Sequence, residues 1–406
     1  MKVAVIGTGG REHALAVKSL KSPHVDAVHV IPGNTGMLMT KGVTLWTGWD
    51  GDFASLKGYL RDHGIDLVII GNEAYLAAGI VDYFVDSEIT VFGPLQHAAR
   101  LEYDKDFAKR FMHAHDIPTA AFTTCTTYEE AVSHMETLIG TLVIKQNCLA
   151  LGKGVLVTDD RVEAEQFLRE SFEATDTVVF ERFLEGREFS LLAFVNHDYY
   201  NLMRPARDYK RAYDHDKGLN TGGMGAYTPV EYISDADLQH VEQTIVIPTV
   251  QGLLKEGIEF TGILYFGLMK TADSIEVIEY NTRFGDPEAE VLLESMDSDL
   301  IEVIAATMGK TPYPLRWKQG ITLGVCMAAT GYPKSYKKDL AVNIPESVPC
   351  FSMALRKEGA EFMSDGGRVA FIVASGETIE EAQRRCYTHV ESVSCPDLFC
   401  RRDIGL

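Results

Sequence analysis

Residues 275–288 read IEVIEYNTRFGDPE and carry three side chains whose types and spacing suit a metal ion and a phosphate. On a β-strand Glu279, Asn281 and Arg283 share one face, because side chains alternate between faces. A carboxylate and an amide oxygen are ligands that Mg²⁺ prefers, and nucleotide phosphates and water complete such a site. Arg283 can hold a phosphate or a carboxylate with a fork of N–H donors. Because Asn is disfavoured in strands, we prefer this interpretation to a solvated strand.

Two lysines lie beside a glycine turn further upstream. In TLVIKQNCLALGKGV, Lys145 ends an apolar strand and Lys153 lies between Gly152 and Gly154. The spacing is not that of a P-loop, but a glycine loop between antiparallel strands can cover phosphates with backbone N–H groups. Each lysine, including Lys105 at the start of a predicted helix, could instead be solvated surface. Lys145 is the exception, because it would be half buried without an anionic partner.

The stretch VVFERFLEGREFS adds two carboxylates, Glu181 and Glu188. A strand through ERFL can present backbone groups to an adenine edge, and Glu188 can accept hydrogen bonds from ribose hydroxyls. The alternative is an exposed hairpin with charged turn residues, which the spacing alone does not exclude.

The first glycine turn, GTGGRE, resembles a dinucleotide fingerprint only in part. Gly7 and Gly9 fill the first two glycine positions of G-x-G-x-x-G, but Glu12 stands at the third. The ribose-binding acid is also missing, because the second strand leads into PGN. NAD is therefore the least favoured ligand. A phosphate site at Gly9 and Gly10 stays open, since helix N-termini attract anions, and the alternative is a turn that only connects two elements.

Residues 204–229, RPARDYKRAYDHDKGLNTGGMGAYTP, predict a long loop with mixed charges and several glycines. Long loops without a core of their own are often functional or disordered. Asp214, Gly222 and Gly223 are candidates for binding a small zwitterion or a phosphate. A flexible surface insertion is the alternative.

The scaffold for these residues begins with a predicted parallel sheet. The runs KVAVIG, AVHVI, DLVII and ITVFG alternate with helical segments, which indicates β-α-β units with helices on both faces. Ligands in such sheets bind at the carboxyl ends of the strands, where GTGGRE, PGNTGM and GNEAYL follow. Residues 119–190 predict a small antiparallel α+β unit. Two more strands, joined by a turn at Ala272-Asp273, and a last α+β unit from residue 319 follow.

Composition excludes several classes of function. The 406 residues carry a formal net charge of -20 and no long Lys/Arg block, so a nucleic-acid surface is not expected. The seven cysteines form no CxxC pair, which argues against a zinc site and is typical of a reducing cytoplasm. Glycine interrupts the N-terminal MKVAVIG too soon for a signal peptide, and no apolar run is long enough to cross a membrane.

Together these motifs resemble the ATP-grasp ligases, and within them the glycinamide ribonucleotide synthetase family. The resemblance covers nearly the whole chain. It rests on GGREHAL, PGNTGM, DKDFAKRFM, IPTA, VIK with LGKGV, NTGGMGAYTP, IEYNTRFGDPE, GGRV and the tail CRRDIG. The pair NTGGMGAYTP and NTRFGDPE is its most specific part.

The resemblance implies an α/β protein with the ATP-grasp fold in four parts. These are an N-terminal Rossmann-like parallel-sheet domain (1–101), an α+β lid (119–190), a central ATP-grasp domain (102–118 and 191–318) and a small C-terminal α+β domain (319–406). It also implies an ADP-forming ligase of purine biosynthesis that joins glycine to phosphoribosylamine through glycyl phosphate. ATP would be co-substrate, Mg²⁺ or Mn²⁺ the cofactor, and the protein a monomer or homodimer without nucleic-acid or membrane partners.

The resemblance further implies roles for individual residues. Glu279 and Asn281 would bind the metal ion, and Lys145, Asp214 and Arg283 would be catalytic. The implied ATP contacts are Lys105, Lys145, Gly152, Lys153, Gly154, Glu181, Phe183, Leu184 and Glu188. The implied contacts to phosphoribosylamine and glycine are Gly9, Gly10, Arg11, Gly33, Asn34, Glu73, Asp214, Asn220, Gly222, Gly223, Arg283, Gly285 and Asp286.

Two departures from the family's motifs support a second hypothesis. Gln146-Asn147-Cys148 stands where the family has Ala-Asp-Gly, and GNEAY replaces Gly-Pro-Glu-x-Pro in the first domain. A related ATP-grasp ligase with another amino acid or amine is therefore the main alternative. A non-catalytic nucleotide-binding protein is a third, against which the retained metal pair and lysines argue.

Overall fold

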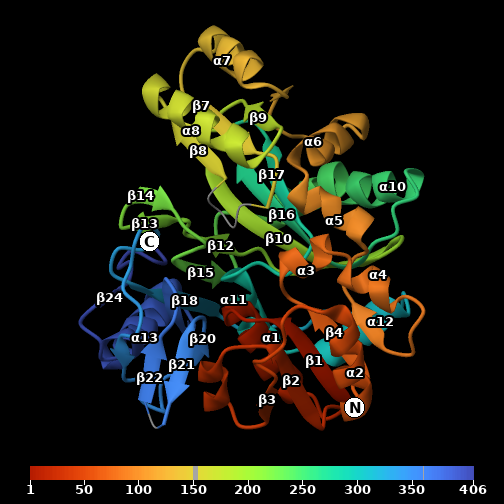
Figure 1. Ribbon diagram of the computed structural model, residues 1–406, viewed down its shortest axis with the longest axis vertical. Coiled ribbons are helices and arrows are strands. Elements are labelled where there is room, and N and C mark those ends of the chain that lie inside the picture. The colour runs from red at the N-terminus through yellow and green to blue at the C-terminus, as the bar shows by residue number, and fades with distance from the viewer. Residues whose placement is uncertain (150–153, 360) are drawn as a thin grey trace.

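The computed structural model describes residues 1–149, 154–359 and 361–406. They contain four sheets of four or more strands, a three-stranded sheet and a two-stranded hairpin, together with the helices that cover them. Figure 1 shows the lid at one end of the molecule and the N-terminal and C-terminal sheets at the other, with the central sheet between them. Among the described residues, no helix has both the length and the apolar character needed to cross a bilayer.

The N-terminal sheet is parallel, as predicted, with the strand order β3-β2-β1-β4-β5. Its strands are β1 (Lys2–Gly7), β2 (Ala27–Pro32), β3 (Val43–Leu45), β4 (Leu67–Ile70) and β5 (Thr90–Phe92). Its helices are α1 (Gly10–Leu20), α2 (Phe53–His63), α3 (Glu73–Ala77), α4 (Ile80–Phe84) and α5 (Gln96–Tyr103). The strand order reverses beside β1, so the turns after β1, β2 and β4 open on one crevice.

The lid is the predicted antiparallel α+β unit. Its sheet has the order β6-β9-β7-β8 with antiparallel pairs throughout. The elements are β6 (Phe122–Cys125), α7 (Tyr128–Thr137), β7 (Leu142–Gln146), β8 (Val155–Thr158), α8 (Arg161–Ala174) and β9 (Val178–Glu181). Helices α7 and α8 contact each other and pack against this sheet around their own apolar core.

The central sheet, β11-β10-β16-β17, is antiparallel and carries the metal motif on its edge strand. Its strands are β10 (Arg187–Asn196), β11 (Tyr199–Leu202), β16 (Thr261–Lys270) and β17 (Ile275–Asn281). The α-helices between residues 104 and 318 outside the lid are α6 (Lys105–Ala114), α9 (Asp235–Val241), α10 (Ile247–Lys255), α11 (Glu288–Ser295) and α12 (Leu300–Met308). The proposed lid boundary at residue 190 falls inside β10, which pairs with β16 along its full length.

The C-terminal sheet corrects one prediction, because residues 204–229 are not a structureless loop. They contribute β12 (Arg207–Asp208) and β15 (Gly225–Thr228) to the order β12-β15-β18-β23-β20, and they form the hairpin β13 (Arg211–Tyr213) and β14 (Lys217–Asn220). The partner of β15 is β18, almost a hundred residues later in the chain. Such nonlocal pairing leaves no periodic signal in a glycine-rich stretch.

The other C-terminal elements complete this unit. They are β18 (Ile321–Ala329), β19 (Ala341–Val342), β20 (Cys350–Ser352), β21 (Leu355–Glu358), β22 (Glu361–Ser364), β23 (Arg368–Gly376), α13 (Ile379–Ser392) and β24 (Leu398–Phe399). Helix α13 packs on β18 and β23, and helix α11 lies between α1 and strands β15 and β18. The buried helix α11 thus joins the N-terminal and C-terminal units.

His13 at this junction predicts an acid-sensitive fold. Its imidazole is fully buried, Nδ1 accepts from the Ser352 N–H at 2.8 Å, and burial lowers its pKa to about 3. The His13 imidazole of the unfolded chain binds a proton near pH 6.5, whereas the buried imidazole of the folded chain does not. Stability should therefore fall by about 1.4 kcal/mol per pH unit as the pH drops below about 6.5.

Urea unfolding at about pH 7.5 and about pH 5 measures this effect, which should amount to about 2 kcal/mol for His13. His13→Gln should flatten the pH dependence, whereas His240→Gln, at an exposed position, should leave it unchanged. Equal slopes for His13→Gln and the unmodified protein would contradict the assignment.

Candidate active site

Strand β17 presents the predicted metal ligands at the edge of the central sheet. The pairing with β16 shifts by one residue beside Glu279, which lies opposite Gly267. A side-chain carbon at position 267 would meet the Glu279 side chain at 3.1 Å, so glycine leaves room for this carboxylate. Asn281 ends the strand, and both side chains are partly exposed. The local geometry therefore brings a carboxylate and an amide to the same end of one strand.

Glu279 and Asn281 suit a hard divalent cation, because both offer oxygen ligands. Burial raises the pKa of the Glu279 carboxyl, but the charges of Lys210, Lys145 and Lys105 outweigh this and hold its pKa below the ordinary value. Among the described residues, its one ion pair is a 3.9 Å contact with Lys210 Nζ. An ionised carboxylate with free lone pairs fits a metal ligand.

Arg283 is surrounded by acceptors of the protein itself. Its Nη2 donates to Asn281 Oδ1 at 3.3 Å and lies 2.9 Å from Glu102 Oε1, while Nε lies 3.3 Å from Glu73 Oε2. Burial raises the pKa of Glu73, but the charges of Arg283 and Arg11 lower it to about 2. The structure thus ties the metal strand to the N-terminal domain. Sequence reasoning missed Glu102, which stands in no motif that marks it.

Lys145 and Glu181, predicted from separate motifs, form one buried ion pair. Lys145 Nζ lies 2.7 Å from Glu181 Oε1 and donates to the Ile278 carbonyl at 3.0 Å, and only 4% of its side chain is exposed. Lys109 Nζ lies 2.8 Å from the other oxygen, Glu181 Oε2. The partner that Lys145 needed for burial is therefore Glu181, and Lys109 is a second cation that the sequence did not single out.

Lys105 begins helix α6 and reaches the segment that precedes the glycine loop. Its Nζ donates to the Cys148 carbonyl at 3.0 Å. Burial lowers the Lys105 pKa, against the opposing charge of Glu279. Gly154 is buried at the end of the loop, whereas the predicted phosphate contacts Gly152 and Lys153 lie outside the described residues.

Lys210 links two predicted sites and is the functional candidate that sequence reasoning underrated. Its Nζ lies 3.2 Å from Glu188 Oε2, a predicted ribose contact, and 3.9 Å from Glu279 Oε1. Burial lowers the Lys210 pKa, but the charge of Glu188 and other acidic groups raises it well above its ordinary value. Of the predicted adenosine segment, Phe183 is exposed and Leu184 is buried.

The first glycine turn contains a carboxylate of its own. The Gly9 N–H donates to Glu12 Oε2 at 2.6 Å, and Arg11 Nε donates to Glu12 Oε1 at 2.6 Å. A side-chain carbon at Gly7 would meet Glu12 at 2.6 Å, so Glu12 fills the space beside the turn. The Arg11 guanidinium is buried and also lies 3.6 Å from Glu73. Both features argue further against a dinucleotide turn.

The neighbouring turns face the C-terminal unit. Gly10 is buried, and a side-chain carbon there would meet Glu290 Oε1 at 2.4 Å. Gly33 has φ +69°, a conformation that favours glycine. The Asn34 amide donates to the Thr8 carbonyl at 2.7 Å and accepts from the Ser352 hydroxyl. Asn34 therefore joins the first two glycine turns to strand β20.

The two most specific motifs, NTGGMGAYTP and NTRFGDPE, meet at Arg368. Arg368 Nη1 donates to the Gly222 carbonyl at 2.6 Å and lies 2.8 Å from Asp286 Oδ1. A side-chain carbon at Gly223 or at Gly285 would approach a neighbouring side chain to 2.3 Å. Close packing therefore requires glycine at both positions. No pattern in the sequence singles out Arg368, although it lies in the motif GGRV.

The remaining predicted substrate residues lie on the β13–β14 hairpin. Asn220 pairs with Arg211 across it, and Asp214 lies in its turn, where Oδ1 accepts from the Arg402 N–H at 2.7 Å. No contact between described groups joins Asp214 to Arg283, so this structure does not bring the two predicted glycine contacts together.

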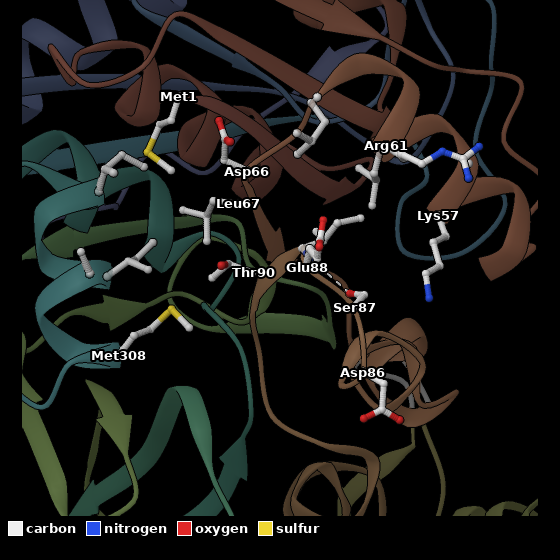
Figure 2. Close-up of a pocket in the computed structure, with 18 of the residues that line it drawn as sticks. Met1, Lys57, Arg61, Asp66, Leu67, Asp86, Ser87, Glu88, Thr90 and Met308 are labelled. Carbon is white, nitrogen blue, oxygen red and sulfur yellow. Dashed lines mark hydrogen bonds between the residues drawn. The ribbon is translucent and has the colours of Figure 1, made fainter.

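A cavity of about 940 Å³ lies away from all these residues. Figure 2 shows Asp66, Leu67 and Thr90 at its wall, near the amino ends of β4 and β5, with Met308 of α12 on the other side. None of the predicted site residues that the structure describes lines it. Because ligands of parallel sheets bind at the carboxyl ends of the strands, this cavity is not the candidate active site.

A parallel N-terminal domain, an antiparallel lid and a central sheet with an acid–amide pair facing lysines define an ATP-grasp enzyme. Three models of phosphoribosylglycinamide synthetase match consecutive parts of the chain: the N domain at residues 1–102, the ATP-grasp (A) domain at 103–289 and the C domain at 322–406. The chain belongs to the phosphoribosylglycinamide synthetase family.

Relatives match over nearly their whole length. A phosphoribosylamine–glycine ligase from Listeria monocytogenes is 42% identical over 100% of this chain and 99% of its own, and one from Lactococcus lactis is 41% identical with the same coverage. The solved phosphoribosylamine–glycine ligase of Thermotoga maritima is 32% identical, with a TM-score of 0.86 and full coverage of both chains. An N5-carboxyaminoimidazole synthase from Aspergillus clavatus, 14% identical with a TM-score of 0.66, shares the fold.

These findings confirm the predicted ATP-grasp fold and the predicted class of enzyme, an ATP-dependent ligase of the purine pathway. Enzymes of this class use ATP and a divalent metal ion. The roles of individual residues stay predictions.

Proposed function

We propose that this protein joins glycine to 5-phosphoribosylamine with ATP, giving glycinamide ribonucleotide, ADP and phosphate. The family membership supports the reaction. The observation that carries the assignment of the site is the ionised Glu279 beside Asn281, faced by Lys210, Lys145 and Lys105. One acid and three cations at a strand end form a receptacle for a metal-bound triphosphate.

In this proposal ATP lies between the lid and the central sheet. Lys105 and Lys145, with the loop that includes Gly152, Lys153 and Gly154, hold the phosphates. Adenosine contacts the segment of Glu181, Phe183 and Leu184, and Glu188 accepts from the ribose hydroxyls. Glu279 and Asn281 hold Mg²⁺ or Mn²⁺, which supplies charge stabilisation for the phosphoryl oxygens when bound.

The first step forms an acyl phosphate. A glycine carboxylate oxygen attacks the γ-phosphorus of ATP, and the bond from that phosphorus to the β–γ bridging oxygen breaks to release ADP. The lysines neutralise the negative charge that spreads over the transferring group. No protein nucleophile is required, so catalysis depends on positioning and electrostatics.

In the second step the amine of phosphoribosylamine attacks the carbonyl carbon of glycyl phosphate. Phosphate leaves and the amine loses a proton, giving the amide. The glycine turns of the N-terminal sheet, with Gly9, Gly10, Gly33 and Asn34, bind the sugar phosphate beside this centre. The closed lid excludes water, which would otherwise hydrolyse the acyl phosphate.

Glycine binding is assigned to the β13–β14 hairpin and its neighbours. Asp214 and Asn220 on the hairpin, and Gly222 and Gly223 after it, contribute polar and backbone groups. Arg283, the predicted catalytic residue and second glycine contact, donates to Asn281 and lies beside the carboxylates of Glu73 and Glu102, so in this proposal it also holds Asn281 in place. Arg11, Gly285 and Asp286 complete the wall between the two substrate sites.

ATP-dependent incorporation of labelled amino acids into an acid-stable phosphoribosyl amide tests the substrate assignment. Glycine should exceed alanine, serine and β-alanine by at least about 10²-fold in kcat/KM, because a site closed around a hydrogen side chain excludes larger ones. A clear preference for another amino acid would favour the second candidate, a related ligase, which the unusual Gln146-Asn147-Cys148 motivates.

The finer organisation belongs to the same proposal. The four parts comprise residues 1–101, 119–190, 102–118 with 191–318, and 319–406. We expect a monomer or homodimer in the cytoplasm, where a reducing environment agrees with the free state of all seven cysteines.

A further inference from the structure

The C-terminal tail, residues 400–406 with the sequence CRRDIGL, is a motif for which the proposed reaction has no direct use. Its second residue, Arg401, is the largest fully buried side chain of the described residues, with 1% of the side chain exposed. An arginine is seldom buried so completely unless its donors are paired. The partners of its guanidinium therefore indicate what the tail is for.

Arg401 joins the tail to the β13–β14 hairpin. Inside the tail, Nε donates to Asp403 Oδ1 at 2.8 Å and Nη2 donates to Asp403 Oδ2 at 2.7 Å, which fixes the plane of the guanidinium. Its Nη1 donates outward to the Arg211 carbonyl at 3.0 Å and to Asp216 Oδ1 at 2.9 Å. The first acceptor lies on strand β13 and the second lies in the hairpin turn.

Two more contacts connect the same segments. The His215 N–H donates to Asp403 Oδ2 at 2.8 Å, and the Arg402 N–H donates to Asp214 Oδ1 at 2.7 Å. Burial raises the pKa of Asp403, but its hydrogen bonds with Arg401 and His215 lower it to about 2. The turn residues 214–216 thus each contact the tail, and Asp214 receives its described hydrogen bond from it.

The tail is itself anchored to rigid parts of the C-terminal unit. The Tyr387 hydroxyl on helix α13 donates to the Arg401 carbonyl at 2.8 Å, and the Gly405 N–H donates to the Tyr209 hydroxyl at 2.9 Å. Ile404 is fully buried against Gly225 of β15. The hairpin, which is short and whose second strand is largely exposed, is therefore held by its contacts with the C-terminal tail.

We propose that Arg401 is a positioning residue for the amino-acid substrate: its buried guanidinium fixes the hairpin turn that carries Asp214. The inference rests on the proposed function, because that function assigns glycine to this hairpin. It adds a task for the C-terminal domain, which contributes no predicted contact to ATP or the metal ion. Loss of these hydrogen bonds should loosen the glycine site and leave the ATP contacts on α6, the lid and β17, which lie outside the hairpin, unchanged.

Arg401→Lys is the main test. Lysine keeps the charge, but it cannot donate at the same time to both oxygens of Asp403 and to the two acceptors on the hairpin. We expect KM for glycine to rise about tenfold or more, with KM for ATP within about twofold of normal and kcat largely recovered at saturating glycine. Asp216→Asn, a milder change at an exposed acceptor, should raise KM for glycine in the same direction and secures the test if Arg401→Lys folds poorly.

Arg402→Ala is the matched control. The Arg402 side chain, next to Arg401 in the chain, is 56% exposed, and the substitution keeps the backbone N–H that donates to Asp214. It should leave both KM values unchanged. The inference is overturned if Arg401→Lys raises KM for ATP in parallel with KM for glycine, lowers kcat alone, or behaves like Arg402→Ala.

Amide hydrogen exchange over residues 211–220 separates this inference from the proposed function. Arg401→Lys should speed exchange in the hairpin about tenfold while exchange in the lid strands is unchanged. If the unmodified protein shows no glycine-dependent turnover, the proposed function fails, and the exchange data alone decide whether the tail holds the hairpin. Unchanged exchange at residues 211–220 would refute that.

Discussion

Glu279→Gln is expected to lower turnover about 10³-fold while the protein stays folded. Glutamine keeps the shape of the side chain but removes the charge that faces Lys210, Lys145 and Lys105 and that would ligate the metal ion. Because the proposed chemistry needs no protein nucleophile, charge stabilisation at this strand end is the largest contribution the chain makes. The measurement is ADP release at saturating glycine, phosphoribosylamine and ATP.

Asp273→Asn provides the control for this experiment. Asp273 is exposed in the turn between β16 and β17, the strand that carries Glu279, so the substitution removes one negative charge without changing the site. It should leave turnover within about twofold of normal, as surface substitutions generally do. Turnover of Glu279→Gln close to that of Asp273→Asn would refute the metal assignment.

Lys145→Met should raise KM for ATP at least about tenfold and destabilise the lid by about 3 kcal/mol. Methionine retains the apolar stem, but the buried Glu181 carboxylate loses its partner at 2.7 Å and keeps only Lys109. A buried carboxylate that keeps only one of its two lysine partners destabilises the folded state, so ATP binding and the free energy of unfolding should change together. Titration of ATP binding and urea unfolding measure the two effects.

Lys41→Met, at an exposed position of the N-terminal domain, controls for the loss of a surface charge. It should alter neither quantity. If Lys145→Met destabilises the protein but binds ATP normally, Lys145 is only the structural partner of Glu181, and its assignment to the phosphates is wrong.

The sequence predicts most of what depends on local pattern. Strand and helix alternation indicates the parallel N-terminal sheet, and the lid strands and the turn at Ala272-Asp273 follow from short apolar runs. Glu279 and Asn281 stand out because residues two positions apart lie on the same face of any strand. Lys145 stands out because an apolar run ends on a charge.

Contacts between distant segments are what the sequence does not reveal. Arg368 contacts both Gly222 and Asp286, each more than eighty residues earlier in the chain, and Lys109 on helix α6 reaches Glu181 on strand β9. The segment at residues 204–229 forms strands because β18 offers a partner, although its own composition favours turns. Glu12 shows the converse, since the missing third glycine is visible in the sequence but its carboxylate contact with the turn is not.

The most direct test of the account is one coupled measurement of ADP release with Mg²⁺ and ATP, with glycine and freshly generated phosphoribosylamine supplied singly and together. We expect release to be fast only when both are present, because glycyl phosphate is protected in the closed site until the amine consumes it. No ADP release with both substrates present would contradict the proposed function.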